Sequence, residues 1–242
     1  MNNTAVIKIK GLTKVYKKHK FFGVKKVVGV QELNLEIYEN EIFGLLGLNG
    51  SGKTTTIKLI LGLLHPDSGE IYFNNFKLPD WKLNKHIGYL PELVSFNKKF
   101  SAYELLKFYG DLSGGVTVDR IIEVISFVGL QDSMHRKVGE YSKGMLQRLG
   151  IAQAILHNPS ILIFDEPTSG LDPLGIKEIR DFIVKLKSQG KTIFFSSHLI
   201  SELEKVCDRV AIIHKGKIAR VVENVEWQKE TLEDIFVNCV SS

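Results

Sequence analysis

The sequence predicts an α/β fold with a small helical region set into it. Two short, wholly apolar runs, 161–164 and 192–195, are typical of strands buried on both faces of a sheet. A third apolar run, 42–46, leads into a segment with the apolar spacing of a helix, and this alternation is typical of α/β proteins. The stretch 91–147 differs, because only helical patterns occur in it.

The first third of the chain is expected to be rich in strands. Apolar and alternating segments predict strands at 5–9, 27–30, 33–37, 42–46, 70–73 and 87–90. A helix is expected to begin at Lys53, because apolar residues follow at the spacing of one helix face as far as Leu64. It should end before Pro66, since proline cannot continue a helix.

Capping residues predict where the later helices begin. The expected caps are Ser101 in a capping box with Glu104, Ser142, Asp172 before Pro173, and Ser201 in a short helix. Strands are expected at 161–164 and 192–195, followed by a hairpin across 209–222 and a closing amphipathic helix from Leu232.

Three glycines lie between the apolar run 42–46 and the helix that begins at Lys53. The stretch fits G-x-x-x-x-G-K-[ST] in the strand–loop–helix context of a phosphate-binding loop. Glycines let backbone N–H groups curl around phosphate oxygens, and the helix N-terminus adds donors and a positive dipole end. Lys53 would reach the β- and γ-phosphates, and the Thr54 hydroxyl would bind Mg²⁺. The nucleotide-binding residues are therefore expected to be Gly47, Leu48, Asn49, Gly50, Ser51, Gly52, Lys53, Thr54 and Thr55.

Two further strands end in residues suited to phosphate chemistry. Asp165 and Glu166 follow one buried run, and His198 follows the other. Because ligands gather at the carboxyl ends of strands in an open α/β sheet, we expect these residues near the glycine-rich loop. Asp165 can hold Mg²⁺, Glu166 can accept a proton from an attacking water, and His198 can donate to the γ-phosphate.

A second anion site is expected at the helix that Ser142 caps, where Ser142 and Gly144 lie at the helix N-terminus. This loop belongs to the helical region and is expected to lie too far away to reach the nucleotide of its own chain. Two anion sites in one chain therefore suggest a partner chain that completes the pocket. An ordinary capped helix is the alternative.

Together these motifs resemble the ATP-binding subunit of ABC transporters over nearly the whole chain. The resemblance rests on several matches: the Walker A loop (Gly47 to Thr54), Walker B with its catalytic glutamate (Ile161 to Asp165, then Glu166), the D-loop (Ser169 to Asp172), the switch histidine (His198) and the signature L-S-G-G-Q (Tyr141 to Met145). Tyr16 lies where the family has an aromatic residue that stacks on adenine.

The resemblance implies a P-loop NTPase (RecA-like) core with a mixed sheet, an N-terminal antiparallel β region and a small helical subdomain. The core would comprise 1–90 and 148–242, and the subdomain 91–147. Two subunits would close head to tail on two ATP molecules, each held between Walker A of one subunit and Ser142, Lys143, Gly144 and Met145 of the other. The mate would be an identical chain or a paralogue. Hydrolysis would drive movement of separate transmembrane permease subunits. The ATP-binding subunit would be cytoplasmic and would lie at the inner face of the cell membrane.

Three residues depart from the family pattern. Lys143 replaces the first glycine of the signature and adds positive charge near the γ-phosphate of the mate's ATP. Met145 replaces its glutamine and removes an amide. Glu92 replaces the glutamine of the loop that links Mg²⁺ to the membrane partner, and glutamate can still bind the metal. These variants resemble the branch that includes drug, antibiotic and bacteriocin exporters.

The net charge of +5 is concentrated in one stretch, which contains Lys14, Lys17, Lys18, Lys20, Lys25 and Lys26. A solvated loop is the simplest interpretation, and a site that attracts ATP or anionic lipid headgroups is the alternative. No nucleic-acid partner is expected, because the excess is modest. The competing function is a soluble ABC ATPase that acts on nucleic acid or ribosomes, but the long coiled-coil insertion and the tandem domains of such relatives are absent from this sequence.

Overall fold

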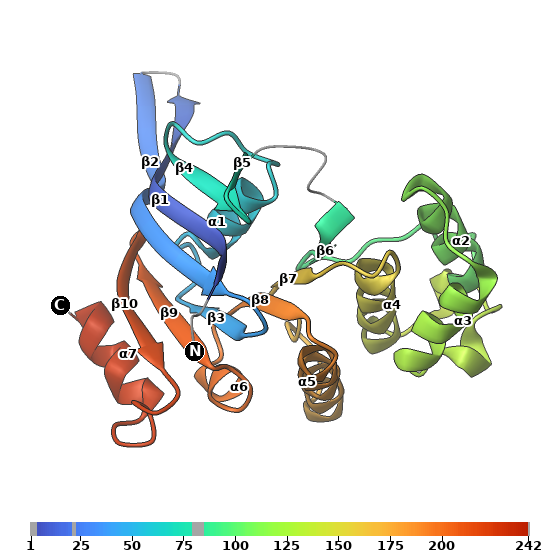
Figure 1. Cartoon of the computed structure of the whole chain (residues 1–242). Coiled ribbons are helices and arrows are strands. Elements are labelled where there is room, and N and C mark those ends of the chain that lie inside the picture. Colours follow the sequence, from blue (N-terminus) through green and yellow to red (C-terminus); the bar gives the residue numbers. More distant parts are fainter. Residues whose placement is uncertain (1–3, 21–22, 79–84, 242) are drawn as a thin grey trace. The chain divides into compact units, whose positions relative to one another are not determined.

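The computed structural model describes residues 4–20, 23–78 and 85–241, and the chain divides into two compact units. Unit 1 consists of Met1–Leu83 and Thr192–Ser242, and unit 2 of Asn84–Lys191. Figure 1 shows the elements of both units along the chain. None of the helices among the described residues combines the length and the hydropathy that crossing a bilayer requires.

Unit 1 contains an antiparallel sheet in the order β2-β1-β4-β5. Its strands are β1 (Ala5–Lys20), β2 (Gly23–Tyr38), β4 (Ser68–Phe73) and β5 (Phe76–Leu78). The pairing of β1 with β4 ends at Thr13↔Ser68, so β1 and β2 continue beyond β4 as a two-stranded ribbon (Figure 1). This ribbon contains the lysine-rich stretch, so the expectation of a loop there was wrong. Strand β5 was not predicted.

The second group of strands in unit 1 has the order β10-β9-β3-β8. It contains β3 (Ile42–Leu46), β8 (Thr192–Ser197), β9 (Arg209–His214) and β10 (Lys217–Glu223). Strand β3 runs parallel to β8 and β9, whereas β10 is antiparallel to β9, which confirms a mixed sheet. All residues of β3 and β8 are buried, as their apolar runs predicted.

The helices of unit 1 are α1 (Lys53–Ile60), α6 (Ile200–Glu204) and α7 (Leu232–Ser241). The predicted end of α1 was wrong, because the helix stops at Ile60 and the chain turns at Gly62, where φ is +69°. The predicted cap of α6 was also wrong. Leu199 occupies the N-cap position without a side-chain hydrogen bond, and Ser201 lies inside the helix.

Unit 2 contains a parallel pair of strands, β6 (Ile87–Leu90) and β7 (Ile161–Asp165). Its helices are α2 (Ala102–Leu112), α3 (Val118–Phe127), α4 (Lys143–Ile155) and α5 (Pro173–Ser188), with short 3₁₀ turns at Gln131–Ser133 and Val138–Glu140. The predicted caps of α2, α4 and α5 are confirmed. Ser101 and Glu104 form a complete capping box, Ser142 accepts from Met145 N, and Asp172 accepts from Gly175 N.

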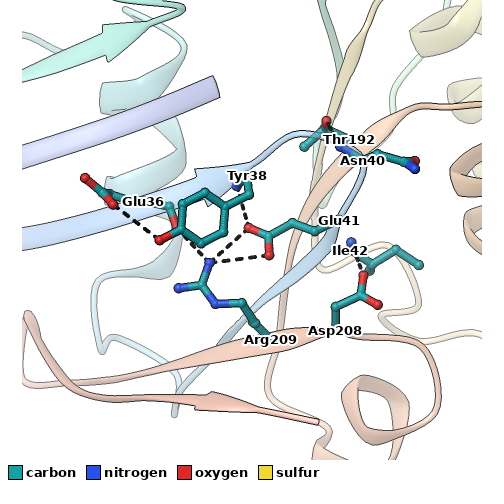
Figure 2. Close-up of polar contacts among 8 residues, drawn as sticks. All are labelled: Glu36, Tyr38, Asn40, Glu41, Ile42, Thr192, Asp208 and Arg209. Atoms are coloured by element: carbon teal, nitrogen blue, oxygen red, sulfur yellow. Dashed lines mark hydrogen bonds and ion pairs between the residues drawn. The ribbon is translucent and has the colours of Figure 1, made fainter. Parts of the chain in front are cut away.

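An ion pair at the start of β3 joins segments far apart in the sequence (Figure 2). Arg209 Nη1 donates to both carboxylate oxygens of Glu41, at 3.2 and 3.4 Å, and to the Glu36 carbonyl oxygen at 3.2 Å. The guanidinium also lies over the rings of Tyr38 and Phe43, at 4.5 and 5.1 Å from their centroids. Arg209 was expected in a strand and Glu41 just before one, but their pairing could not be foreseen.

Two further hydrogen bonds fix the same end of β3 (Figure 2). Ile42 N donates to Asp208 Oδ2 at 2.7 Å, and Asn40 N donates to Thr192 Oγ1 at 2.8 Å. The amino end of β3 is therefore tied to β8 and to the residue before β9. The glycine-rich loop follows the carboxyl end of β3. Contacts that fix the strand at its amino end therefore also help to position the loop.

The burial of the Glu41 carboxyl group predicts a pH dependence of stability. Burial raises the pKa of Glu41 above its usual 4.5, although the Tyr38 N–H and Arg209 oppose the rise. A carboxyl group with a raised folded-state pKa stabilises the fold below its unfolded pKa, and this contribution is lost as the pH rises through the folded pKa. We therefore expect the stability of the wild type relative to Glu41→Gln to fall as the pH rises above 4.5.

Urea unfolding of both proteins across this range measures the difference. Other carboxyl groups, such as Asp67 and Glu70, have lowered pKa values and contribute the opposite slope, but they cancel in the comparison of two chains that share them. Glu233→Gln, on the exposed side of α7, makes the same chemical change elsewhere and is the control. A pH-independent difference for Glu41→Gln would contradict the assignment.

Candidate functional site

The glycine-rich loop of unit 1 follows β3 and is closed by its own lysine. Lys53 Nζ donates to the carbonyl oxygens of Gly47 at 2.7 Å and Leu48 at 3.4 Å. The residue is only 5% exposed, so its ammonium group lies against the loop and not in open solvent. A positive charge held over a loop of backbone N–H groups is suited to binding an anion.

At two glycines of this loop there is no room for the Cβ atom of another residue. A Cβ at Gly47 would overlap Ser51 Oγ and lie 2.6 Å from the Ile213 carbonyl oxygen. At Gly52, φ is +115° and a Cβ would lie 2.5 Å from the carbonyl oxygen of Gly29. Gly52 is also the N-cap of α1 and makes no side-chain hydrogen bond, so the first N–H groups of the helix point along the axis into the loop. The loop therefore combines close backbone packing with a helix N-terminus.

Tyr16 lies near the start of α1, the helix that follows this loop. Its hydroxyl group and Thr55 Oγ1 are 3.3 Å apart, and a Cβ at Gly29 would lie only 2.7 Å from its ring. The half-buried ring thus packs on Gly29, and its hydroxyl reaches the start of α1. The position suits an aromatic residue that borders a bound nucleotide.

His198 also belongs to the loop end of unit 1. Strand β8 pairs with β3 up to Leu46↔Ser197, and Gly47 N donates to the Ser197 carbonyl oxygen at 3.4 Å. His198 follows directly and is exposed. The turn behind it is fixed, because Ser197 Oγ accepts from Leu199 N at 2.9 Å. The expected convergence of these two strand ends is therefore present.

In unit 2 the parallel strands β6 and β7 bring three acidic or phenolic residues together. Asp165 ends β7 and is 1% exposed, while Glu92 follows Leu90, which is the β6 partner of Phe164. Burial raises the pKa of Tyr89 to about 12, and the negative charges of Asp165 and Glu92 add to the rise. The phenol therefore stays protonated at neutral pH. Nothing in the sequence selects Tyr89, because its place near Asp165 depends on the pairing of β6 with β7.

Glu166 has an unusual backbone. It is a buried residue, 6% exposed, and its φ of +48° lies in the left-handed region that non-glycine residues seldom adopt. Such conformations are costly and concentrate at functional sites. The segment that follows is anchored by Gln147, whose Nε2 donates to the Pro167 carbonyl oxygen at 2.8 Å. Gln147 was also missed, although a buried glutamine in α4 is a polar residue where apolar ones prevail.

The signature-like loop and the D-loop of unit 2 line one groove of about 420 Å³. Its walls include Ser142, Lys143, Gly144, Arg148 and Asp172. Ser142 Oγ accepts from Met145 N at 3.2 Å, and Asp172 Oδ1 accepts from Gly175 N at 2.7 Å, so both residues cap helices that open on the groove. The two motifs thus form a single concave surface.

Lys143 has a structural counterpart in the D-loop. A Cβ at Gly170 would overlap the Lys143 ammonium group, and Gly170 has a φ of +66°. The lysine that replaces the family's first signature glycine therefore extends over a glycine of the D-loop and brings positive charge into the groove. The absence of a Cβ at Gly170 makes room for it.

Oxygen donors of the kind that Mg²⁺ prefers occur in each unit. Unit 2 has the carboxylates of Asp165 and Glu92, and unit 1 has the Thr54 hydroxyl. Burial is the main reason that the pKa of Tyr89 is raised, and the two carboxylates add to it.

Comparison with known proteins agrees with these features. The family model described as ABC transporter matches residues 30–169, and the chain belongs to this family as an ATP-binding cassette. It is 41% identical to an uncharacterised ABC transporter ATP-binding protein of Nostoc sp. over 222 residues, which are 90% of this chain and 66% of the relative. It is 44% identical to the bacitracin transport ATP-binding protein BcrA of Bacillus licheniformis over 218 residues, 89% of this chain and 69% of that protein. The chain thus spans about two thirds of the length of these relatives.

Solved structures show the same fold. The ATP-binding subunit of an ABC transporter superimposes with a TM-score of 0.82 at 26% identity, covering 97% of this chain and 99% of that one. A dimeric ATP-binding cassette in a post-hydrolysis state with ADP and Pi gives a TM-score of 0.81 at 27% identity, covering 90% and 98%. The predicted P-loop NTPase fold, with its antiparallel β region and its helices, is confirmed.

Proposed function

We propose that this chain is the ATP-hydrolysing subunit of an exporter. The observation that carries the proposal is the loop end of unit 1, where a buried Lys53, two glycines without room for a Cβ, and His198 lie together. In the proposed reaction Lys53 binds the β- and γ-phosphates of ATP, and Tyr16 stacks on adenine. The surrounding N–H groups of the loop hold the remaining phosphate oxygens.

Hydrolysis also needs a proton acceptor. We assign this role to Glu166, which directly follows Asp165 and has a left-handed backbone. Glu166 accepts the proton of the attacking water, and His198 donates a hydrogen bond to the γ-phosphate. Mg²⁺, held by Thr54, Asp165 and Glu92, would neutralise charge on the phosphates.

The groove of unit 2 is proposed to serve the ATP of a second copy. Ser142, Lys143, Gly144 and Met145 would face the γ-phosphate bound by the mate's loop, with Asp172 at the same interface. The dimeric state of the related cassette with ADP and Pi supports two copies of one chain. In this proposal residues 1–90 with 148–242 form the nucleotide core, and 91–147 form the signature subdomain.

Transport requires partner proteins that span the membrane. We propose that closure and opening of the pair drive separate transmembrane permease subunits, with the cassette at the cytoplasmic face of the membrane. Export is supported by the names of relatives, which include bacitracin transport and, in Mycobacterium tuberculosis, fluoroquinolone export at 39% identity. RNA-stimulated hydrolysis would favour the alternative of a soluble ATPase.

Substitution of Ser142 by arginine tests the role of the second copy. The bulky cation fills the groove, so we expect loss of the ATP-dependent dimer in size-exclusion chromatography with light scattering, while ATP affinity of the monomer is unchanged. Ser142→Ala separates the effect of the lost cap, which costs about 1 kcal/mol of stability, from the effect of bulk. Ser126→Arg, on the exposed side of α3, adds the same charge elsewhere. An ATP-dependent dimer of Ser142→Arg would refute the assignment.

A further inference from the structure

The two-stranded end of the β1–β2 hairpin has an extreme composition. Residues 14–20 and 23–28, here named the basic ribbon, contain six lysines and no Asp, Glu, Arg, Asn or Gln. Its base is fixed to unit 1, because Lys14 Nζ and Val15 N both bond to the Asp67 carboxylate, at 3.2 and 2.6 Å. Beyond this point the pairing with β4 has ended, and β2 is the strand with which β1 pairs.

The strand register places like charges opposite one another. Lys17 pairs with Lys26, and Lys18 pairs with Lys25. Directly opposed like charges destabilise an antiparallel pair, and a two-stranded ribbon has little stability of its own. Because Lys25 and Lys26 are adjacent in the strand, their side chains point to opposite faces, so both faces of the ribbon are positive.

The lysines at this end are available to a partner. Lys17, Lys25 and Lys26 are exposed and form no ion pair among the residues that the structure describes. Asp67 is used at the base of the ribbon, where Lys14 and the Val15 N–H, with a smaller effect of Lys17, hold its pKa below the usual value. The charge of the ribbon is therefore compensated at its base and uncompensated further out.

The composition of the ribbon favours an anionic membrane surface over a nucleic acid as its partner. Proteins read nucleic-acid bases with Arg, Lys, Asn and Gln, and of these four the ribbon has only Lys. The stretch also contains valines at 15, 24, 27 and 28, and Val28 is 47% exposed. Lysines beside exposed aliphatic side chains suit the headgroup region of a bilayer. There the ammonium groups bind lipid phosphates, and the apolar side chains pack at the boundary of the acyl chains.

We propose that the basic ribbon binds the anionic phospholipid surface of a membrane through Lys17, Lys25 and Lys26. The contact goes beyond the proposed function, since it needs neither ATP nor a permease. It gives the cassette its own attachment to the bilayer, independent of the groove and of the glycine-rich loop. Each lysine near an anionic surface strengthens binding by roughly fivefold.

Flotation of the full chain with lipid vesicles tests the proposal. We expect binding to vesicles that contain phosphatidylglycerol, weak binding to pure phosphatidylcholine, and a decrease with added salt. The triple variant Lys17→Gln, Lys25→Gln, Lys26→Gln should lose about 100-fold in partition coefficient. The control Lys205→Gln, Lys217→Gln, Lys229→Gln removes the same charge from exposed positions elsewhere in unit 1 and should lose only a few fold.

Three results would overturn the proposal. Equal losses in the two triple variants would show that only net charge matters. A raised KM for ATP in the ribbon variant, with vesicle binding intact, would show that the ribbon collects nucleotide. Tighter binding to single-stranded RNA than to anionic vesicles, lost in the ribbon variant, would make nucleic acid the partner. Thermal unfolding of each variant verifies that the chain remains folded, and a failure of vesicle binding leaves the ATPase proposal untouched.

Discussion

Replacement of Glu166 by glutamine is expected to lower kcat for ATP hydrolysis by about 100- to 10,000-fold, which is the usual contribution of a general base. Glutamine has nearly the shape of glutamate, so the left-handed backbone at this position, with φ of +48°, should be kept. ATP binding should therefore persist, because only the proton acceptor is lost. Two copies should remain closed on ATP, since reopening requires hydrolysis in the proposed cycle.

Steady-state phosphate release and light scattering with Mg-ATP measure both parts of this result. Glu233→Gln in α7 is the matched control, with the same chemical change at an exposed position, and native turnover is expected. If Glu166→Gln hydrolyses ATP at the native rate, another residue accepts the proton. A variant that neither binds ATP nor dimerises would indicate a structural role for the carboxylate.

Replacement of Lys53 by alanine is expected to weaken ATP binding by about 10- to 150-fold. The estimate follows from the loss of hydrogen bonds to charged phosphate, which are worth about 1.5–3 kcal/mol. The ammonium group also holds the Gly47 and Leu48 carbonyl oxygens, so part of the loss comes from a loosened loop. Isothermal titration with ATP measures the affinity.

Three further variants distinguish the effect of the Lys53 charge on ATP affinity from the effect of its aliphatic chain. Lys53→Met keeps the aliphatic chain and should bind ATP nearly as weakly as Lys53→Ala, because the charge carries the effect. Lys53→Arg keeps the charge and should retain more affinity. Lys58→Ala removes an exposed lysine from the last turn of the same helix and should leave affinity unchanged. Unchanged ATP affinity in Lys53→Ala would count against the phosphate-binding role of the loop.

Features determined by a few neighbouring residues were predictable from the sequence. The caps at Ser101, Ser142 and Asp172 were predicted correctly, because an N-cap bond joins residues three positions apart. The buried strands β3, β7 and β8 were predicted by uninterrupted apolar runs. The glycine-rich loop was predictable for the same reason, since its geometry is encoded within a single turn.

Features that depend on distant partners were not predictable. Arg209 lies 168 residues from Glu41, and neither residue signals the other in the sequence. The position of Lys143 over Gly170 depends on the packing of two loops in unit 2. The length of β1 and β2 was also missed, because lysines interrupt the alternation of apolar residues that marks a strand. The early end of α1 shows that apolar spacing can continue past a turn at glycine.

The central claim is that each ATP site is shared between two copies of this chain, and mixing two defective variants tests it most directly. Lys53→Ala lacks a working phosphate loop and keeps its groove, whereas Ser142→Arg has the reverse defect. Each variant alone should hydrolyse almost no ATP. An equimolar mixture should regain a substantial fraction of wild-type activity, because mixed pairs contain one intact site. Native turnover by Ser142→Arg alone, or a mixture no more active than the sum of its parts, would contradict the claim.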